Sequence, residues 1–416
     1  MLIGSGYYNR CLSEDEVRHI CAEVFEHLLK QGQKILFIIP DHTRSAPIDM
    51  MFKVVYELLS SKMDHLDFLI ALGTHPPMSQ TMICERVGIT QKSQLEKYPK
   101  ARFFNHHWND PEQLMHIGTL GSSELSEISN GLMSDSVEVT INRMVMDYDQ
   151  LIIIGPTFPH EVVGFSGGCK YLFPGISGAE IINMFHWLGA LITNLEIIGK
   201  ADTPVRQVID RSAQFLQIPV HCISLVVTGD HLAGLYAGSW NEAWRKAAQL
   251  SEKLHIIYKE HSFRRVLSCA PDMYDDLWTG GKCMYKLEPV VADGGELIIY
   301  APHISEVSVT HGEIIKKIGY HVRDYFTNQW KRFHDFPGGV LAHSTHVKGV
   351  GTYRNGIEKS RIRVTLATSI PENVCNQINL GYLDPASIHP EDWMNREADR
   401  ILYIKKAGEM LYRLKQ

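Results

Sequence analysis

Short apolar runs that end in a polar turn recur along the chain and predict buried strands. The runs are KILFIIPDHT, LDFLIALGTH, DQLIIIGPTFPH, RRVLSCAPD, GELIIYAPH and GVLAHSTH. Each is nearly continuous in apolar residues, which is typical of strands in a parallel sheet that is covered on both faces. The runs therefore favour an α/β fold with mainly parallel sheets.

Amphipathic segments between these runs predict the helices that flank the sheets. They include SEDEVRHICAEVFEHLLKQG, NEAWRKAAQLSEKLHIIYKEH and the more apolar AEIINMFHWLGAL. Ser13 and Glu16 have the spacing of a capping box at the start of the first segment. A final helix is predicted over about 393–416, in NREADRILYIKKAGEMLYRLKQ.

The length of the chain predicts two domains. A chain of 416 residues exceeds what one ordinary core accommodates. The boundary is expected near residue 265, where a long helix ends and a new series of strands begins. We therefore predict an N-terminal α/β domain over 1–264 and a C-terminal α/β domain over 265–392, with the final helix able to pack back on the first domain.

Composition and charge narrow the class of protein. Apolar residues make up 44% of the chain and charged residues 21%, which is typical of a folded globular protein. A net charge of −6 gives no reason to expect a nucleic acid or an anionic membrane as partner. The eight cysteines form no C-x-x-C pair, which favours reduced thiols. With no leader-like N-terminus and no apolar run of bilayer length, a cytoplasmic location is expected.

Polar residues with catalytic chemistry cluster at the predicted strand ends. These positions carry the DHTR turn from Asp41 to Arg44, the GTH turn that ends at His75, and His160. Loops at the carboxyl ends of parallel strands converge on one site, so we expect a shared site in the crevice between the domains. His75 and His160 are candidates for acid/base work, although helix capping and loop hydrogen bonding remain alternatives.

Charged side chains near these turns leave several interpretations open. Arg44 can grip a carboxylate or phosphate, or form a local ion pair with Asp41. Lys170 lies in the glycine-rich bend PHEVVGFSGGCKYLFPGISG, where it can contact phosphate, carry a covalent group or be solvated. The bend is not a P-loop, because Cys169 precedes the lysine.

Other histidines and lysines carry weaker indications when taken alone. His186 lies on the apolar helical segment, where a hydrogen-bonded core histidine is commoner than a ligand. The segment DLWTGGKCMYKLEP predicts that Lys282 is an ordinary lysine at the start of a helix. His343 and His346 are three residues apart in HSTHVKG, an acceptable metal spacing for which no third ligand is visible.

Taken in order, these motifs resemble the nickel-pincer lactate racemase family of 2-hydroxyacid racemases and epimerases. The resemblance covers most of the chain and is strongest over 34–189 and 269–300. The matching residues are DHTR at 41–44, GTH at 73–75, Asn105-His106, the bend at 159–178, His186 and Lys282. The ordered set is far more specific than any one member.

The resemblance implies a covalent cofactor. In this family a lysine at the position of Lys170 is joined to a nickel-pincer nucleotide, pyridinium-3-thioamide-5-thiocarboxylic acid mononucleotide. A histidine at the position of His186 ligates the nickel, which replaces the core-histidine interpretation. Gly167 and Gly168 would let the nucleotide lie against the backbone, while Asp41 and Ser177 would help to hold it.

The resemblance also implies the reaction. His75 and His160 match the paired acid/base groups, one for each enantiomer. One removes the hydroxyl proton while the C2 hydrogen leaves as hydride to the pyridinium ring, and the resulting 2-keto acid takes the hydride back on its other face. Arg44 and Lys282 would hold the substrate carboxylate. Transient partners would be the cofactor-synthesis and nickel-insertion proteins.

The chain departs from the lactate racemase pattern just before Lys282. Trp278 and Thr279 stand where lactate racemase has a tyrosine and a glutamine. Together with extra sequence between His75 and His160, this favours a larger 2-hydroxy acid such as an aldonate. Two other hypotheses remain: a sensor or binding protein that has lost the cofactor, and a metal-dependent lyase. Loss of a site residue would indicate the sensor, and carboxylate-rich metal ligation would indicate the lyase. The sequence shows neither feature.

Overall fold

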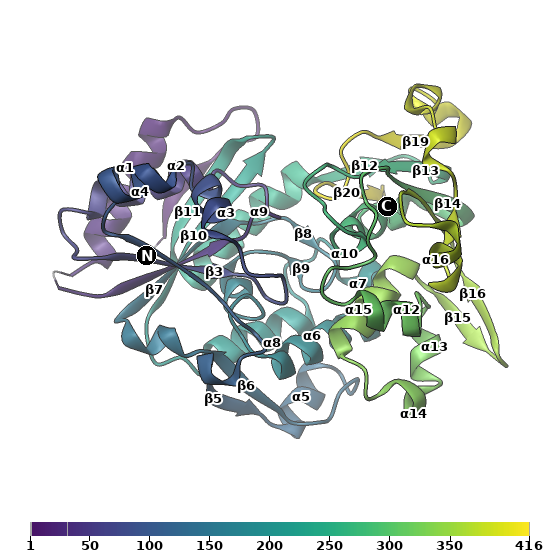
Figure 1. Cartoon of the computed structure of the whole chain (residues 1–416), viewed down its shortest axis with the longest axis horizontal. Coiled ribbons are helices and arrows are strands. Elements are labelled where there is room, and N and C mark those ends of the chain that lie inside the picture. The colour runs from purple at the N-terminus through teal and green to yellow at the C-terminus, as the bar shows by residue number, and fades with distance from the viewer. Residues whose placement is uncertain (1, 31, 416) are drawn as a thin grey trace. The chain divides into compact units, whose positions relative to one another are not determined.

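The protein divides into two compact units, each with its own sheet (Figure 1). A computed structural model describes residues 2–30 and 32–415. The first unit comprises 1–158, 165–182 and 206–254, and the second comprises 159–164, 183–205 and 255–416. The predicted boundary at 264/265 falls inside strand β13 (Phe263–Cys269), and two short segments of the N-terminal half belong to the second unit.

The first unit is built on a seven-stranded sheet with the order β1-β11-β10-β7-β2-β3-β4. The strands from β10 to β4 run parallel, whereas β11 is antiparallel to both β10 and β1. Their bounds are β1 (Leu2–Gly6), β2 (Ile35–Pro40), β3 (Leu66–Ala71), β4 (Ala101–Asn105), β7 (Gln150–Pro156), β10 (Val220–Thr228) and β11 (His231–Ser239). The strands predicted at 35–40, 66–71 and 150–156 are confirmed.

Both faces of this sheet are buried, which explains the continuous apolar runs. On one face, Phe37 and Phe68 pack with residues of α1 (Glu14–Leu28) and α2 (Ile48–Leu59), which lie side by side in Figure 1. On the other face, Ile38 and Leu69 are also fully buried. The capping box of Ser13 and Glu16 at the start of α1 is confirmed, with both reciprocal hydrogen bonds present.

Further elements complete the first unit. The helices are α3 (Gln80–Arg86), α4 (Gln91–Lys97), α5 (Ser122–Ile128), α8 (Pro204–Ala213) and α9 (Trp240–His255), and the strands β5 (Leu114–Leu120) and β6 (Val137–Asn142) pair antiparallel. Helix α6 (Ala179–Ile192) begins in the first unit and continues into the second. The short strand β9 (Gly164–Phe165) likewise crosses a boundary between the units, as do the first two residues of α8 and the last residue of α9.

The second unit contains a parallel five-stranded sheet with the order β18-β17-β14-β13-β19. The sheet strands are β13, β14 (Val291–Ala301), β17 (Arg363–Thr368), β18 (Gly381–Tyr382) and β19 (Ile401–Ile404). The other strands are β8 (Pro159–His160), β12 (Ile256–Lys259), β15 (Gly351–Arg354), β16 (Ile357–Ser360) and β20 (Leu411–Leu414). The helices are α7 (Asn194–Ile197), α10 (Leu277–Gly280), α11 (Lys282–Tyr285), α12 (Gly312–Ile318), α13 (Arg323–Thr327), α14 (Trp330–Phe333), α15 (Gly338–Lys348) and α16 (Glu372–Gln377).

Two predicted elements of the second unit are wrong. The run GVLAHSTH forms the helix α15 instead of a strand. The expected C-terminal helix is replaced by two short strands, because β19 pairs with β13 and β20 pairs with β12. Gly408, between these strands, has φ of 100°, a conformation that does not occur in a helix. No helix among residues 2–30 and 32–415 is long and apolar enough to cross a lipid bilayer.

Candidate active site

The predicted residues of the first unit gather at the carboxyl end of its parallel strands. Strands β2 and β3 are neighbours, with Pro40 opposite Ala71 in the register. The loops that follow these strands carry Asp41 and His75. Because adjacent parallel strands end at the same edge of a sheet, the two side chains are brought together there.

Asp41 and His75 form a close pair. Nδ1 of His75 lies 2.5 Å from Oδ2 of Asp41. The other carboxylate oxygen, Oδ1, accepts hydrogen bonds from the main-chain N–H of Thr43 at 3.1 Å and from the Thr43 hydroxyl at 2.7 Å. Asp41 is only 3% exposed, whereas the His75 side chain keeps 23% of its surface accessible.

The charge of the Asp41 carboxylate is stabilised by its neighbours. Burial by itself raises the pKa of Asp41, but the charge of His75 in its protonated form and the hydrogen bond from its ring outweigh this effect, with further help from Arg44 and Thr43. The net result is a pKa well below the ordinary value for aspartate. Asp41 is therefore ionised at neutral pH and accepts the N–H of His75.

Arg86 holds the DHTR turn in place, a role that sequence reasoning missed. This arginine ends α3 and donates to three main-chain carbonyls, those of Pro40 at 3.4 Å, Arg44 at 2.9 Å and Ala46 at 3.2 Å. Burial lowers the pKa of Arg86, but the carbonyls satisfy its donors. A lone arginine in a helical segment has no spacing that would have revealed it.

Lys170 lies on a tight turn that follows β7. The turn is the 3-10 helix Gly168–Tyr171, preceded by Gly167 with φ of 84°, and Gly168 has φ of 60°. A Cβ atom on Gly167 would lie 2.5 Å from Oγ1 of Thr157, and one on Gly168 would lie 2.9 Å from Cγ of Trp244. The glycines are thus required by the protein's own packing, apart from any need to make room for a nucleotide.

The Lys170 turn is tied to the loop that carries His75. The main-chain N–H of Gly73 donates to the carbonyl of Gly175 at 2.9 Å. A Cβ atom on Gly175 would come within 2.9 Å of Cβ of Ala71, so the end of β3 packs directly on this loop. The peptide bond between Phe173 and Pro174 in the same loop is cis. Asp41, His75 and the Lys170 turn therefore share one edge of one sheet.

His106 fixes the far end of the Lys170 loop. Its Nε2 donates to the carbonyl of Ser177 at 3.0 Å, and its Nδ1 accepts from the side-chain amide of Asn142 at 3.2 Å. Burial lowers the pKa of His106 to about 4, so its ring is neutral. The preceding Asn105 binds both main-chain polar atoms of Met78, in the loop after His75. The Asn105-His106 pair thus braces two loops of the site.

The surroundings of Lys170 suit a bound anionic group. Oγ1 of Thr157 and Oη of Tyr171 are buried without a hydrogen-bond partner among the described residues, and both lie at this turn. Buried polar atoms without a partner are rare in native proteins, and a bound polar group is one explanation for them. Lys170 itself is partly buried and offers a primary amine, and the Arg44 guanidinium can bind phosphate. The donor set of the first unit therefore fits the predicted nucleotide.

His160, in the second unit, belongs to the short strand β8. Its Nδ1 lies 3.1 Å from the main-chain nitrogen of Val162 and 3.3 Å from Oε2 of Glu161. A main-chain N–H can only donate, so Nδ1 acts as the acceptor and the contact with Glu161 is not an ion pair through this atom. In the neutral ring the hydrogen is then carried by Nε2.

His186 lies in the second-unit part of α6. Its ring stacks on the fully buried Phe185, with centroids 4.5 Å apart. The predicted helix is confirmed, and the ring is partly buried. An imidazole nitrogen is a suitable ligand for nickel. Among the described residues, no three histidine, cysteine, aspartate or glutamate side chains gather as a metal cluster.

The segment from Asp276 to Lys282 carries the remaining predicted residues. The Asp276 carboxylate caps α10 by accepting from the N–H of Thr279 at 3.0 Å and from its hydroxyl at 2.9 Å. Trp278 is partly buried. Lys282 begins α11, as predicted, and its ammonium group lies 4.6 Å from the centre of the Tyr274 ring.

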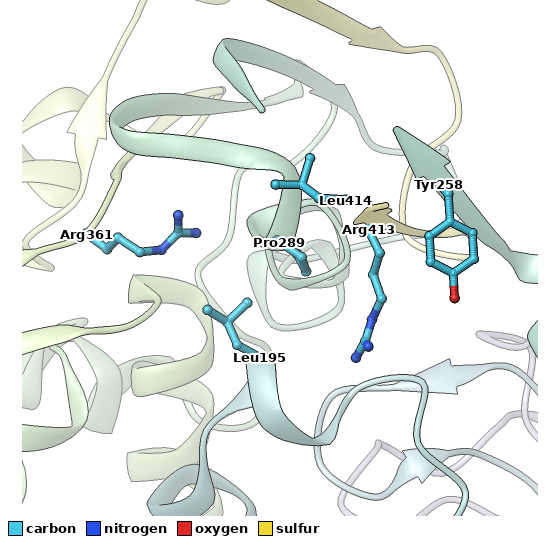
Figure 2. Close-up of a pocket in the computed structure, with 6 residues that line it drawn as sticks. All are labelled: Leu195, Tyr258, Pro289, Arg361, Arg413 and Leu414. Atoms are coloured by element: carbon cyan, nitrogen blue, oxygen red, sulfur yellow. The ribbon is translucent and has the colours of Figure 1, made fainter. Parts of the chain in front are cut away.

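A pocket of about 450 Å³ in the second unit is lined by none of the predicted site residues (Figure 2). Arg361 and Arg413 line it, together with the apolar side chains of Leu195, Pro289 and Leu414 and with Tyr258. Arg361 donates to the carbonyls of Val291 and Glu288 at 2.7 Å and 2.6 Å, and Arg413 donates to the carbonyl of Ile198. Because both guanidinium groups hold main-chain segments and no predicted residue lines the pocket, it is not the candidate site.

Comparison with known proteins finds similarity to lactate racemases. The profile of the lactate racemase N-terminal domain matches residues 17–196. The lactate racemase of Lactiplantibacillus plantarum is 26% identical over 187 residues, which are 43% of this chain and 40% of that enzyme. The lactate racemase of Thermoanaerobacterium thermosaccharolyticum is 22% identical over 308 residues, 71% of this chain and 68% of that enzyme. The chain thus contains a match to the lactate racemase N-terminal domain and is similar to two lactate racemases.

Solved structures agree over almost the whole chain. A crystal structure of a protein from Thermotoga maritima is 34% identical, with a TM-score of 0.90, and the match covers 97% of this chain and 99% of that one. The lactate racemase apoprotein of T. thermosaccharolyticum has a TM-score of 0.71 at 17% identity, covering 99% and 100% of the two chains, and shows that the fold is shared. The α/β fold class is confirmed.

The matched range and the division into two units sort the predicted residues into three groups. The first group lies in the first unit, within the matched range 17–196, and comprises Asp41, Arg44, His75, Gly167, Gly168, Lys170 and Ser177. His160 and His186 lie in the same range but in the second unit, and Trp278, Thr279 and Lys282 lie beyond it. The expected location of the site between the domains stays a prediction. The alignment spans less than half of the L. plantarum enzyme, so activity and substrate belong to the proposal that follows.

Proposed function

We propose that the protein is a racemase or epimerase that inverts C2 of a 2-hydroxy acid. Similarity to two lactate racemases, which are isomerases, supports this class of reaction. The observation that carries the proposal is the contact between Nδ1 of His75 and the Asp41 carboxylate. A histidine held in this way beside an amine-bearing turn has the chemistry of a general base next to a tethered cofactor.

Asp41 selects the tautomer of His75 that a base needs. A carboxylate only accepts hydrogen bonds, so Nδ1 of His75 carries the hydrogen. In the neutral ring the lone pair is then on Nε2, and among the described residues no other hydrogen bond to the His75 ring is found. Nε2 would remove the proton of the substrate hydroxyl, and the Asp41 charge would stabilise the imidazolium that forms.

His160 is held in the opposite tautomer. Its Nδ1 accepts the N–H of Val162, so Nε2 carries the hydrogen when the ring is neutral. The two histidines are thus prepared as a proton acceptor and a proton donor. Racemisation needs one acid/base group for each enantiomer. His160 would accept a proton at Nε2 only after its hydrogen moves to Nδ1, which gives up the bond from Val162.

The substrate carboxylate would be bound by Arg44 and Lys282. The main chain of Arg44 is held by Arg86, which restricts the position of the guanidinium. The ammonium group of Lys282 rests against the Tyr274 ring. Two cations on a carboxylate keep it ionised and orient C2 relative to the histidines.

Lys170 would carry the nickel-pincer nucleotide, with His186 as a nickel ligand and Asp41, Ser177, Gly167 and Gly168 around the nucleotide. When bound, this cofactor supplies a hydride acceptor for the C2 hydrogen. The chain's own contribution is the rigid Lys170 turn, which is fixed by glycine packing and by the His106 contact to Ser177. The buried hydroxyls of Thr157 and Tyr171 would provide further polar contacts.

The substrate would be larger than lactate, for example an aldonate. Thr279 uses its hydroxyl to bind Asp276 and so does not replace the glutamine amide of lactate racemase. The Trp278 indole offers a broad apolar face with one N–H donor. A longer 2-hydroxy acid with further hydroxyl groups would use such a surface.

Co-expression with the cofactor-synthesis proteins tests the proposal. We expect a nucleotide-sized mass on the peptide that contains Lys170, about one nickel per chain, and inversion of C2 in a panel of single-enantiomer 2-hydroxy acids. Lys170→Ala should lose the added mass and the activity together. Loaded protein that inverts no member of a panel containing lactates, malates and aldonates would contradict the proposed activity.

A further inference from the structure

His343 makes two contacts with Trp278. This histidine lies in the middle of α15 and is 8% exposed. Its ring is stacked on the Trp278 indole, with centroids 4.1 Å apart and planes 9° from parallel. Its Nε2 lies 3.0 Å from the main-chain oxygen of Trp278. One side chain therefore contacts both the ring and the backbone of the same residue.

The hydrogen bond determines the state of the His343 ring. A carbonyl oxygen can only accept, so Nε2 carries a hydrogen and donates it to Trp278. Burial lowers the pKa of His343 to about 4, and the Trp278 carbonyl and the charges of Asp276 and Glu161 only partly oppose this effect. The ring is neutral at neutral pH, which allows stacking without the cost of a buried charge.

The Trp278 backbone is fixed on its other sides as well. Its N–H donates to the carbonyl of Val307 at 3.1 Å, and the N–H of the preceding Leu277 donates to the carbonyl of Glu306 at 3.0 Å. The freedom that remains is rotation of the indole. His343 on α15 restricts it, and His311, with centroids 4.6 Å away at an angle of 42°, provides a second ring contact.

The same helix presses on the turn that leads to Lys282. A Cβ atom on Gly281 would lie 3.2 Å from Nε2 of His343 and 2.8 Å from Cγ2 of Val347. A side chain at position 281 would therefore push α15 away. Gly281 is needed for this approach, and Lys282 follows it directly. His343 is thus packed against two neighbouring points of the segment 278–282.

We propose that His343 is a positioning residue that fixes the Trp278 indole and the turn before Lys282, and thereby determines which 2-hydroxy acids are accepted. The effect on substrate choice rests on the proposed function, because it requires Trp278 and Lys282 to contact the substrate. The stacking of His343 on Trp278 does not depend on the proposed function. The motif HSTHVKG thus gains a role in aligning a wall of the site.

His346 provides an internal control. It lies on the same helix, is 4% exposed, and also has a pKa lowered to about 4 by burial. Its ring packs edge-on to Tyr285, with centroids 6.3 Å apart. A change at His346 therefore perturbs the same helix at similar burial, and its described ring contact is with Tyr285 and not Trp278.

Four variants separate the parts of the proposal. His343→Phe keeps a ring for stacking but loses the donor, His343→Ala loses both, His346→Gln is the control, and Trp278→Phe isolates the Trp278 fluorescence by difference. Relative to the wild type, the emission of Trp278 should shift to longer wavelength in His343→Ala and shift less in His343→Phe. It should be unchanged in His346→Gln. This readout needs neither cofactor nor activity.

Steady-state kinetics on cofactor-loaded protein then test specificity. For the preferred acid, we expect KM to rise about tenfold in His343→Ala with kcat nearly unchanged, since a hydrogen bond and an aromatic contact that orient the binding wall are lost. The preference over lactate should fall by a similar factor. His346→Gln should retain the wild-type preference.

The possible failures are distinguishable. An unshifted Trp278 emission in His343→Ala would overturn the positioning role, whatever the activity. A shifted emission with an unchanged ratio of kcat/KM between the preferred acid and lactate would overturn the role in specificity. Inactive wild-type protein with cofactor attached would instead contradict the proposed function, and the emission would still decide whether His343 orients Trp278.

Discussion

Nδ1 of His75 lies 2.5 Å from the carboxylate of Asp41, although the two residues are 34 positions apart in the chain. The contact exists because β2 and β3 are parallel neighbours that end at the same edge of the sheet. It gives Asp41 a function besides the predicted help in holding a nucleotide. The carboxylate fixes the ring of the proposed base, and it remains charged because the His75, Arg44 and Thr43 interactions outweigh the cost of burial.

Replacing Asp41 by asparagine should disable the base without removing the cofactor. The amide can donate to Nδ1 and so favours the tautomer in which Nε2 of His75 carries the hydrogen. We expect kcat to fall by about 100-fold or more, while intact mass shows an unchanged level of cofactor on Lys170. Loss of the cofactor mass together with activity would show instead that Asp41 mainly holds the nucleotide.

Substitutions of the two histidines should separate chemistry from cofactor attachment. His75→Ala and His160→Ala are expected to keep the added mass and the nickel but to lose inversion of C2, because each proton transfer then lacks its partner. Lys170→Ala should lose the mass. Each variant is measured by intact mass, nickel content and chiral analysis of the product. A histidine variant without cofactor would contradict the acid/base assignment.

Acidification should destabilise the protein through its buried histidines. Burial lowers the pKa of His106 to about 4, whereas an exposed histidine has a pKa of about 6.5. Between these values the unfolded chain binds a proton that the folded chain does not, so the free energy of unfolding falls as the pH decreases. The contribution of His106 is about 3 kcal/mol at most. His106→Gln should flatten the dependence of the unfolding midpoint on pH between 4 and ~6.5. An unchanged slope would count against this origin.

Gly168→Ala should lower the free energy of unfolding by more than the cost of placing alanine at a positive φ. Gly168 has φ of 60°, and its Cβ would lie 2.9 Å from Trp244. Gly229 has φ of 58° and open space around it, so Gly229→Ala measures the backbone cost without a clash. We expect about 1 kcal/mol for Gly229→Ala and about 2 to 4 kcal/mol for Gly168→Ala, measured by denaturant unfolding. Equal losses would show that packing against Trp244 is not tight.

The sequence predicts the parts of the fold in which local pattern and tertiary structure agree. The apolar runs before Asp41 and His75 are buried strands, and Ser13 caps α1 as expected. The sequence also indicates that the polar strand ends contribute to one site, whereas the pairing of β2 with β3 is known only from the structure. Seven of the predicted site residues lie in the first unit, within the range that matches the lactate racemase N-terminal domain.

The failures have physical causes. The run that contains His343 is buried from Val340 to Val347, so it shows no amphipathic period, and a buried helix cannot then be told from a strand. The C-terminal segment has helical spacing, but pairing of β19 and β20 with distant strands overrides this local preference. The clamp formed by Arg86 depends on three carbonyls that lie 40 to 46 residues before it, a relationship that no local motif encodes.

The most direct test of the proposed reaction is inversion of C2 in heavy water. In the proposed reaction the C2 hydrogen leaves with its electron pair and returns to the same carbon, while His75 and His160 move only the hydroxyl proton. Cofactor-loaded protein and one enantiomer of the preferred acid should give the inverted product with protium retained at C2, as measured by mass spectrometry. Deuterium incorporated at C2 at the rate of inversion would show removal of a proton instead, and would contradict the account.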